Sequence, residues 1–189
     1  MKLKKLANSA INFGINRVIE VVGVSILITG VLLLISLVSF SPDDPNFIFS
    51  NNTEIKNILG FRGSFTADIF FQSFGVVSLL IPLSLIISGI NIVLYKEIFL
   101  IIESIFYTIL YSLFGSLFFS FFYPVAFKLY INGNGGFIGK YLETTFLNSL
   151  ININSQVSYF ILILLILFFF LISIQFKIDS FYKIIKKIF

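Results

Sequence analysis

The chain contains no cysteine, no histidine and no tryptophan among its 189 residues, and it has only one methionine and four prolines. These absences exclude thiol chemistry, metal sites with histidine ligands and acid–base catalysis by imidazole, and with them most enzyme mechanisms. Charge is also scarce, because Asp, Glu, Lys and Arg make up 12% of the sequence while hydrophobic residues make up 58%. A soluble domain of this length could not bury so much apolar surface, so the composition excludes a soluble globular protein.

The apolar residues are gathered in four long runs with almost no charge. The hydrocarbon core of a bilayer is about 30 Å thick, and a helix needs roughly 20 residues to cross it. We therefore expect four membrane-spanning helices, at about 21–40, 70–94, 104–123 and 157–176. The sequence predicts an all-α, polytopic membrane protein with a four-helix membrane domain over residues 21–176 and outer loops at 41–69 and 124–156. The first run is too long for a cleavable signal and lacks a cleavage site after it, so we expect the N-terminus to be retained.

Lysine and arginine are unevenly distributed around these runs. Nine of the 13 basic residues lie in segment 1–20, at Lys96 between the second and third runs, or in segment 177–189. The other four lie in the two expected outer loops. Because cytoplasmic segments of membrane proteins are enriched in Lys and Arg, both termini are predicted to be cytoplasmic. An even number of spans agrees with this orientation.

The basic C-terminal tail has two interpretations. Its lysines Lys183, Lys186 and Lys187 could contact nucleic acid, but lysines next to an inner leaflet more often bind anionic lipid and set the topology. We favour the lipid interpretation. The expected partner of this segment is therefore the bilayer, with no direct nucleic-acid binding.

The two expected outer loops differ in character. The first opens with Ser-Pro-Asp-Asp-Pro-Asn at 41–46, in which proline fixes the backbone and aspartate is suited to cap neighbouring amides. We expect this turn to end the first span at the membrane interface. The second contains the flexible segment 132–136, followed by apolar residues at helical spacing: Ile138, Tyr141, Leu142, Phe146 and Leu150. That spacing predicts a short helix on the outer surface.

The third run carries a hydroxyl residue at every fourth position: Ser104, Thr108, Ser112, Ser116 and Ser120. We call these five residues the hydroxyl stripe. Helices in lipid associate through small residues and shared hydrogen bonds, so the stripe predicts a helix-packing ridge. Ser84, Ser88 and Gly89 on the second run are the nearest complement. The alternative is that each hydroxyl bonds a carbonyl of its own helix and faces lipid.

One segment, 134–141, has the outline of a phosphate-binding loop. Such a loop needs glycine at its first position and Ser or Thr at its last, whereas this segment has Asn134 and Tyr141. No buried strand precedes it, and it is expected on the side of the membrane away from ATP. Nucleotide binding is therefore not expected.

The acidic residues offer no clear catalytic or metal site. Asp43 and Asp44 could be taken for a cation site, but Ca²⁺ needs about six to eight oxygen ligands, and we favour capping for both. Glu20, Glu103 and Asp68 lie at expected span edges, where a carboxylate can reach water. A proton-coupled transporter would place an acid near the membrane centre. We expect no enzyme activity, no cofactor and no metal.

Several motifs, taken in order, resemble the N-terminal membrane domain of the FtsK/SpoIIIE family of DNA translocases. They lie at 37–47, where the Ser-Pro-x-Asp-Pro turn closes the first span, at 57–68, and at 135–139 in the second outer loop. The residues that carry the resemblance are Ser41, Pro42, Asp44, Pro45, Asn57, Gly60, Gly63, Asp68, Gly75, Pro82, Pro124, Gly135, Gly136 and Gly139. The resemblance covers roughly residues 21–176.

This resemblance implies a four-helix module in the bacterial inner membrane that anchors a cytoplasmic ATP-driven motor at the division septum and contacts other cell-division membrane proteins. The family's motor works as a hexameric ring, so self-association is implied as well. Family members continue into a linker and an ATPase, whereas this chain ends at Phe189, so DNA translocation is not expected of this polypeptide itself. A complete protein, a fragment and a split gene are all compatible with these residues.

A small four-helix transporter or channel is the alternative function. It would need a charge near the membrane centre or a polar pore lining. The nearest feature in this sequence is the hydroxyl stripe.

Overall fold

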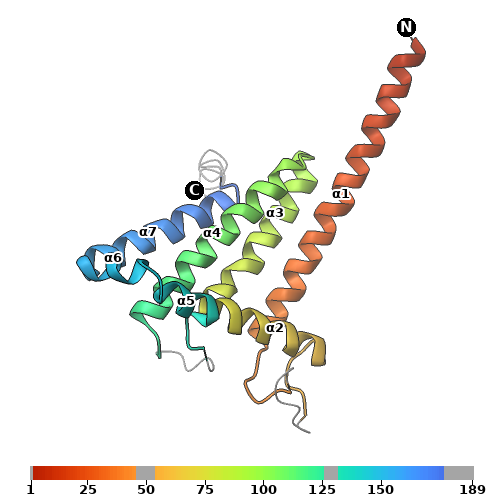
Figure 1. Cartoon of the computed structure of the whole chain (residues 1–189). Coiled ribbons are helices and arrows are strands. Elements are labelled where there is room, and N and C mark those ends of the chain that lie inside the picture. The colour runs from red at the N-terminus through yellow and green to blue at the C-terminus, as the bar shows by residue number, and fades with distance from the viewer. Residues whose placement is uncertain (1, 46–53, 126–131, 177–189) are drawn as a thin grey trace, which may run out of the picture.

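The computed structural model describes residues 2–45, 54–125 and 132–176 (Figure 1). The described residues form helices and turns without a strand. In chain order the elements are α1 (Lys2–Val38), α2 (Gly60–Phe74), the 3₁₀ helix η1 (Gly75–Leu80), α3 (Ile81–Tyr95), α4 (Phe99–Phe122), α5 (Gly136–Glu143), α6 (Leu147–Ile153) and α7 (Ser155–Ser173). The basic tail 177–189 and the motif residues Asn46 and Phe47 lie outside the described residues.

Four of the helical segments are long and apolar enough to cross a bilayer. They are Ile11–Val38, Gly60–Tyr95, Phe99–Phe122 and Ser155–Ser173. Helices are the expected form for such runs, because lipid offers no hydrogen-bond partners and the backbone must satisfy its own polar groups. The predicted all-α fold with four spans is confirmed.

The second span differs from the sequence prediction in its start and in its shape. Its helix begins at Gly60, so residues 60–69, which were expected in the first outer loop, are helical. It is also interrupted, because α2 ends at Phe74 and a 3₁₀ segment leads into α3. Gly75 stands at the break with φ of 70° and ψ of −147°, a backbone conformation that favours glycine.

The predicted short helix of the second outer loop is divided into α5 and α6. The hydroxyls of Thr144 and Thr145 donate to the carbonyls of Tyr141 and Leu142, at 2.7 and 2.6 Å. Such local bonds compete with helix continuation. Phe146 caps the N-terminus of α6, with its side chain exposed.

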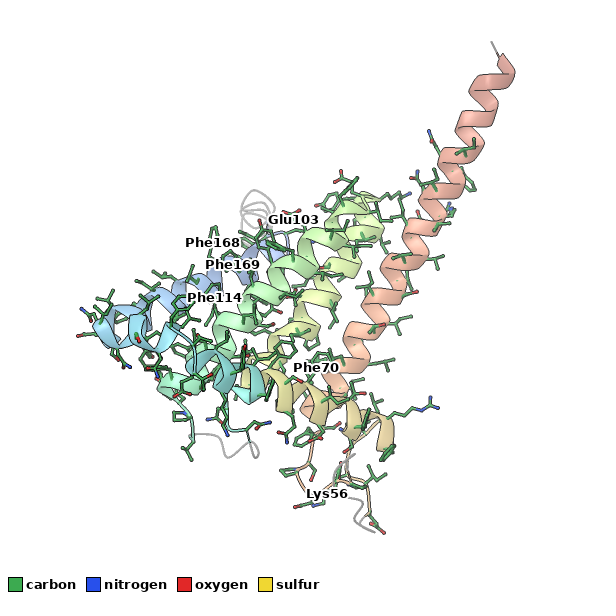
Figure 2. The ribbon with its side chains drawn as sticks, viewed as in Figure 1. Lys56, Phe70, Glu103, Phe114, Phe168 and Phe169 are labelled. Carbon is green, nitrogen blue, oxygen red and sulfur yellow. The ribbon has the colours of Figure 1, made fainter. Side chains whose placement is uncertain are left out.

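The long helices pack in the order α1, α3, α4, α7 (Figure 1). Three glycines bring α1 and α3 close together, because Gly23 and Gly30 of α1 and Gly89 of α3 lie directly against the opposing helix. At the other seam, Phe114 of α4 stacks on Phe169 of α7 with ring centroids 5.7 Å apart (Figure 2).

The remaining helices lie at the end of the bundle that carries the loops. Figure 1 shows that α2 crosses the C-terminal end of α1, and that α5 lies below α4, next to α2. The start of α1, the α3–α4 turn and the end of α7 lie toward the opposite end (Figure 1). The connections between successive long helices thus alternate between the two ends of the bundle, as four membrane spans require. Which end faces the cytoplasm stays a prediction from the charge distribution.

The buried apolar core is small and divided in two. One cluster joins α1, α2, η1, α3 and α4: Leu33, Leu37, Ala67, Phe71, Val77, Ile81 and Tyr111. The other joins α4, α6 and α7: Leu117, Phe118, Ile151 and Leu162. Much of the outer surface of the long helices remains apolar, such as Leu164 of α7, which is 65% exposed. In a membrane-spanning helix such side chains face lipid or another helix.

Candidate functional site: the two loops fastened to the bundle

The first loop is fastened through the carboxylate of Asp44. Its two oxygens accept hydrogen bonds from the backbone amides of Lys56 and Asn57, at 2.8 and 2.9 Å. Asp44 is only 4% exposed, so both bonds are sheltered from water. Bonds from backbone amides to a buried carboxylate are among the stronger hydrogen bonds in proteins. Asp44 therefore closes the loop by holding residues far along the chain, whereas the sequence suggested capping of near neighbours.

Asn57 connects this loop to the first two helices. Its side-chain amide donates to the carbonyl of Ser36 at 2.9 Å, and its side-chain oxygen accepts from the amide of Leu59 at 3.1 Å. Ser36 in turn donates to the carbonyl of Gly63 at 2.5 Å. A Cβ at Gly63 would overlap the Asn57 side chain, so only glycine fits there. We call Ser36, Asp44, Asn57 and Gly63 the loop clasp.

The neighbouring aspartate makes a different contact. The carboxylate of Asp43 pairs with the ammonium of Lys56 at 2.9 Å, and this hydrogen bond raises the pKa of Lys56. Both side chains are exposed, so solvent screens the pair and it contributes little to stability. Figure 2 shows Lys56 at the loop end of the molecule.

The second loop is seated in the break between α2 and η1. The carbonyl of Asn134 accepts from the amide of Val76 at 2.9 Å, and a Cβ at Gly75 would overlap that carbonyl. A Cβ at Gly136 would also overlap backbone atoms, those of Ser73 and Gly75. Asn134 is fully buried and donates from its side chain to the carbonyl of Tyr123. The loop therefore docks backbone to backbone.

The same loop also packs against the C-terminal part of the hydroxyl stripe, at Ser116 and Ser120. A Cβ at Gly135 or Gly139 would overlap the backbone of Ser116 or crowd Ser120. Ser116 donates to the carbonyl of Phe74 at 2.9 Å, which ties α4 to the end of α2. We call Gly75, Asn134, Gly135, Gly136 and Gly139 the glycine junction.

The structure places most of the hydroxyl stripe in the interior. Ser104, Ser112, Ser116 and Ser120 are buried, while Thr108 is half-buried. Their partners differ. Ser104 bonds Ser88 of α3, and Ser120 donates to Glu143 of α5 at 2.7 Å. The hydroxyl of Ser112 has no partner within the described residues.

Ser84, Ser88 and Gly89 were expected to pack against the stripe, and Ser88 does so through its bond to Ser104. Gly89 instead faces α1, where it lies against the backbone of Gly23 and Leu27. Ser84 bonds Tyr111 at 3.0 Å.

Sequence reasoning missed a buried hydroxyl cluster on α3, α4 and α7. The hydroxyl of Ser84 lies 3.0 Å from that of Tyr111 and 2.9 Å from that of Ser173. Ser88 donates to the carbonyl of Ser173 at 3.3 Å. All of these side chains are buried. The spacing of Ser84 and Ser88 was a usable signal, but Ser173 is a lone serine in an apolar run and gave none.

Two contacts hold the end of the bundle opposite the loops. The carboxylate of Glu20 pairs with the ammonium of Lys96 at 2.7 Å, and this ion pair joins α1 to the α3–α4 turn. The side-chain amide of Gln175 donates to the carbonyl of Leu100 at 2.9 Å, which joins the end of α7 to α4. Figure 2 shows Glu103 toward this same end.

The described residues hold no group of three or more His, Cys, Asp and Glu side chains that could bind a metal. The side chains of the loop clasp and of the buried hydroxyl cluster bind one another and the backbone. The arrangement can therefore fix helices and loops in place and present them to lipid or to a partner.

Comparison with known protein families identifies the chain's relatives. A family model described as the 4TM region of DNA translocase FtsK/SpoIIIE matches residues 16–188, which is nearly the whole chain. The chain belongs to the FtsK 4TM family. The family resemblance expected from the loop motifs is confirmed, and the FtsK 4TM chain is a multi-pass protein of the inner membrane.

Three curated relatives are each named DNA translocase FtsK. The FtsK 4TM chain is 41% identical to that of Rickettsia bellii over 64 residues, which are 34% of this chain and 8% of the relative. It is 34% identical to that of Rickettsia prowazekii over 82 residues, 42% of this chain and 11% of the relative. For Rickettsia typhi the identity is 33% over 64 residues, 34% of this chain and 9% of the relative. The matches thus span about a tenth of each relative's length, and no solved structure matches.

The other motif residues of the FtsK 4TM chain have structural positions. The carbonyl of Ser41 accepts from the amide of Asp44 at 3.2 Å, which closes the turn around Pro42. The carbonyl of Pro45 accepts from the hydroxyl of Ser64 at 3.4 Å.

Three further motif residues lie where helices begin or end. Gly60 starts α2 with φ of 65°, and Pro82 lies in the first turn of α3. The carbonyl of Pro124 accepts from the amide of Asn134 at 3.4 Å. Asp68 is buried on α2, and one of its carboxylate oxygens has no partner within the described residues.

Proposed function

We propose that this chain is the membrane-anchoring and protein-interaction module of a cell-division DNA translocase, and that it locates a chromosome-segregation motor at the division septum. The observation that carries the proposal is the family match over residues 16–188. Four helices long and apolar enough to span a membrane support the anchoring part. The relatives that share the matched region are named as DNA translocases, which supports the link to a motor.

The proposed role includes no catalysis in these residues. The match is to a membrane region and not to a motor domain, so translocation would depend on a motor. We assign DNA contact to that motor and lipid contact to this chain.

The proposed partners are other membrane proteins of the division site, together with further copies of the same chain in a hexamer. Two features support this. The clasp and the glycine junction hold the described parts of both loops against the bundle, so these parts present a defined surface at one end of it. The outer faces of α4 and α7 carry large exposed apolar residues that suit contact with another helix, such as Phe106 and Phe168.

A fluorescent protein fused to the C-terminus tests the proposal in dividing bacteria. We expect a band of fluorescence at midcell. The Asp44→Ala variant should weaken the band, because it removes both bonds that close the first loop. Asp43→Ala is the matched control, since that neighbouring carboxylate is exposed and makes a screened ion pair.

Uniform membrane fluorescence of the unmodified chain would contradict the septal part of the proposal. Equal midcell bands in the Asp44→Ala and Asp43→Ala variants would contradict the role of the first loop. Ion or solute flux through reconstituted vesicles would favour the transporter alternative.

A further inference from the structure

An apolar groove opens on the side of the bundle where α1, α2 and α3 meet. Its volume is about 460 Å³, which falls in the range of about 300–1,000 Å³ common for ligand sites. The walls are formed by Leu32 and Leu33 of α1, Phe70 of α2 and Leu85 of α3. Leu32 is 47% exposed, so the groove is open to its surroundings. Figure 2 shows Phe70 between α2 and the lower part of α1.

The groove exists because α1 makes two close contacts with a gap between them. Gly30 lies against the backbone of Ile86 and the side chain of Leu85, which leaves no space between α1 and α3 at that level. Six residues further on, Ser36 bonds the carbonyl of Gly63 and so holds α1 against α2. Those six residues extend about 9 Å along the helix, and the groove lies beside them. It is therefore built into the fold.

The polar side chains that line the groove are already satisfied by the protein. Thr29 donates to the carbonyl of Ser25 at 2.9 Å, and Thr66 donates to the carbonyl of Arg62 at 2.7 Å. Ser36 donates to Gly63 in the clasp. The lining therefore offers mainly carbon, which suits a hydrocarbon chain and not a polar ligand.

One charged side chain, Arg62, lines the groove. It is exposed in the first turn of α2, at the end of the molecule that carries the loops. Among the residues that the structure describes, no carboxylate lies within ion-pair distance of Arg62, and the groove lining includes no acid. The planar guanidinium group binds phosphate oxygens in pairs, so this cation suits a phosphate group.

We propose that this groove binds one anionic glycerophospholipid, with an acyl chain along Leu32, Leu33 and Phe70 and the phosphate on Arg62. A zwitterionic headgroup would bring its own ammonium next to Arg62, and the lining has no carboxylate to receive it. A headgroup such as that of phosphatidylglycerol avoids this repulsion. The bound lipid contacts α1 and α2 together, next to the loop clasp. With the predicted topology it belongs to the outer leaflet.

Quenching of a single tryptophan by brominated lipid tests the proposal, because the chain has no tryptophan of its own. Phe70→Trp places the probe in the groove, and Phe160→Trp places it on the exposed face of α7. Each full-length variant is reconstituted in vesicles with a small fraction of phosphatidylglycerol or phosphatidylethanolamine brominated in the acyl chain. One cation near a membrane surface typically enriches anionic lipid about fivefold. At Phe70→Trp we therefore expect quenching that corresponds to about fivefold more phosphatidylglycerol than its fraction in the vesicle. At Phe160→Trp we expect no such excess.

Adding Arg62→Gln should remove the excess quenching at Phe70→Trp. Lys140→Gln is the matched control, because Lys140 is an exposed cation on α5 near the same end of the bundle, and the excess should persist. Unchanged quenching at Phe160→Trp and unchanged helical circular dichroism verify that Arg62→Gln still folds. Excess quenching that survives Arg62→Gln, or that is equal for phosphatidylethanolamine, would overturn the proposal. Quenching at Phe70→Trp that is no greater than the fraction of brominated lipid in the vesicle predicts would also overturn the proposal.

Discussion

Replacing Gly75 by alanine tests the contact at which the second loop meets the bundle. Gly75 has φ of 70°, and a Cβ there would overlap the carbonyl of Asn134. The substitution therefore adds two costs. A φ of 70° with a ψ of −147° is a region populated essentially by glycine, and it costs about 1–3 kcal/mol for a residue with a side chain. Relieving the overlap by moving the loop costs about 1–3 kcal/mol more, and the bond between Asn134 and Val76 is weakened with it.

Gly60→Ala separates these two costs. Gly60 also has a positive φ, of 65°, but a Cβ there would meet nothing within 4 Å. Gly14→Ala is a second control, because Gly14 lies inside α1 with open space around it, and alanine favours a helix there by about 0.5–1 kcal/mol.

The measurement is reversible unfolding of the three variants in detergent, followed by circular dichroism. Gly75→Ala should lose about 2–6 kcal/mol, Gly60→Ala about 1–3 kcal/mol, and Gly14→Ala should lose nothing. Equal losses for Gly75→Ala and Gly60→Ala would refute the close docking of the second loop, since the strain in the backbone alone would then explain both.

Two further predictions concern the buried hydroxyls. Replacing Ser112 and Ser116 together by leucine should cost about 1–3 kcal/mol of stability, because both are buried in α4, whereas Ser25→Leu on an exposed face of α1 should cost little. Equal tolerance would favour the lipid-facing interpretation of the stripe. Tyr111→Phe should cost about 1 kcal/mol by removing the bond to Ser84, and Tyr107→Phe, which keeps its stacking on Phe169, should be nearly neutral in the same unfolding measurement.

The sequence predicts the spans well because hydropathy and length are local properties. The uncharged runs suffice to place four apolar helices, and the loop motifs suffice to place the chain in its family. The break at Gly75 could not be predicted in the same way. Its φ and its missing Cβ are explained by Asn134, which lies 59 residues further along the chain and meets Gly75 only in the folded state.

The candidate site shows the same division between local and long-range signals. The motif at 41–46 indicates a turn, but only the fold shows that Asp44 holds the amides of Lys56 and Asn57. Ser36 looks like an ordinary residue of an apolar run, yet it joins α1 to α2 through Gly63. Periodicity predicts the hydroxyl stripe, and the structure places its members against different helices. The contribution of the stripe to stability stays a prediction.

The central claim is that a four-span anchor has both termini in the cytoplasm and both loops outside, and cysteine labelling of intact cells tests it most directly. The native chain has no cysteine, so single cysteines carry no background. Glu54→Cys and Lys140→Cys are exposed sites in the first and second loop regions, and Glu97→Cys is an exposed site in the α3–α4 turn. An impermeant maleimide added outside should label the two loop sites and leave Glu97→Cys unlabelled until the membrane is opened. Labelling of Glu97→Cys in intact cells, with the loop sites protected, would contradict the account.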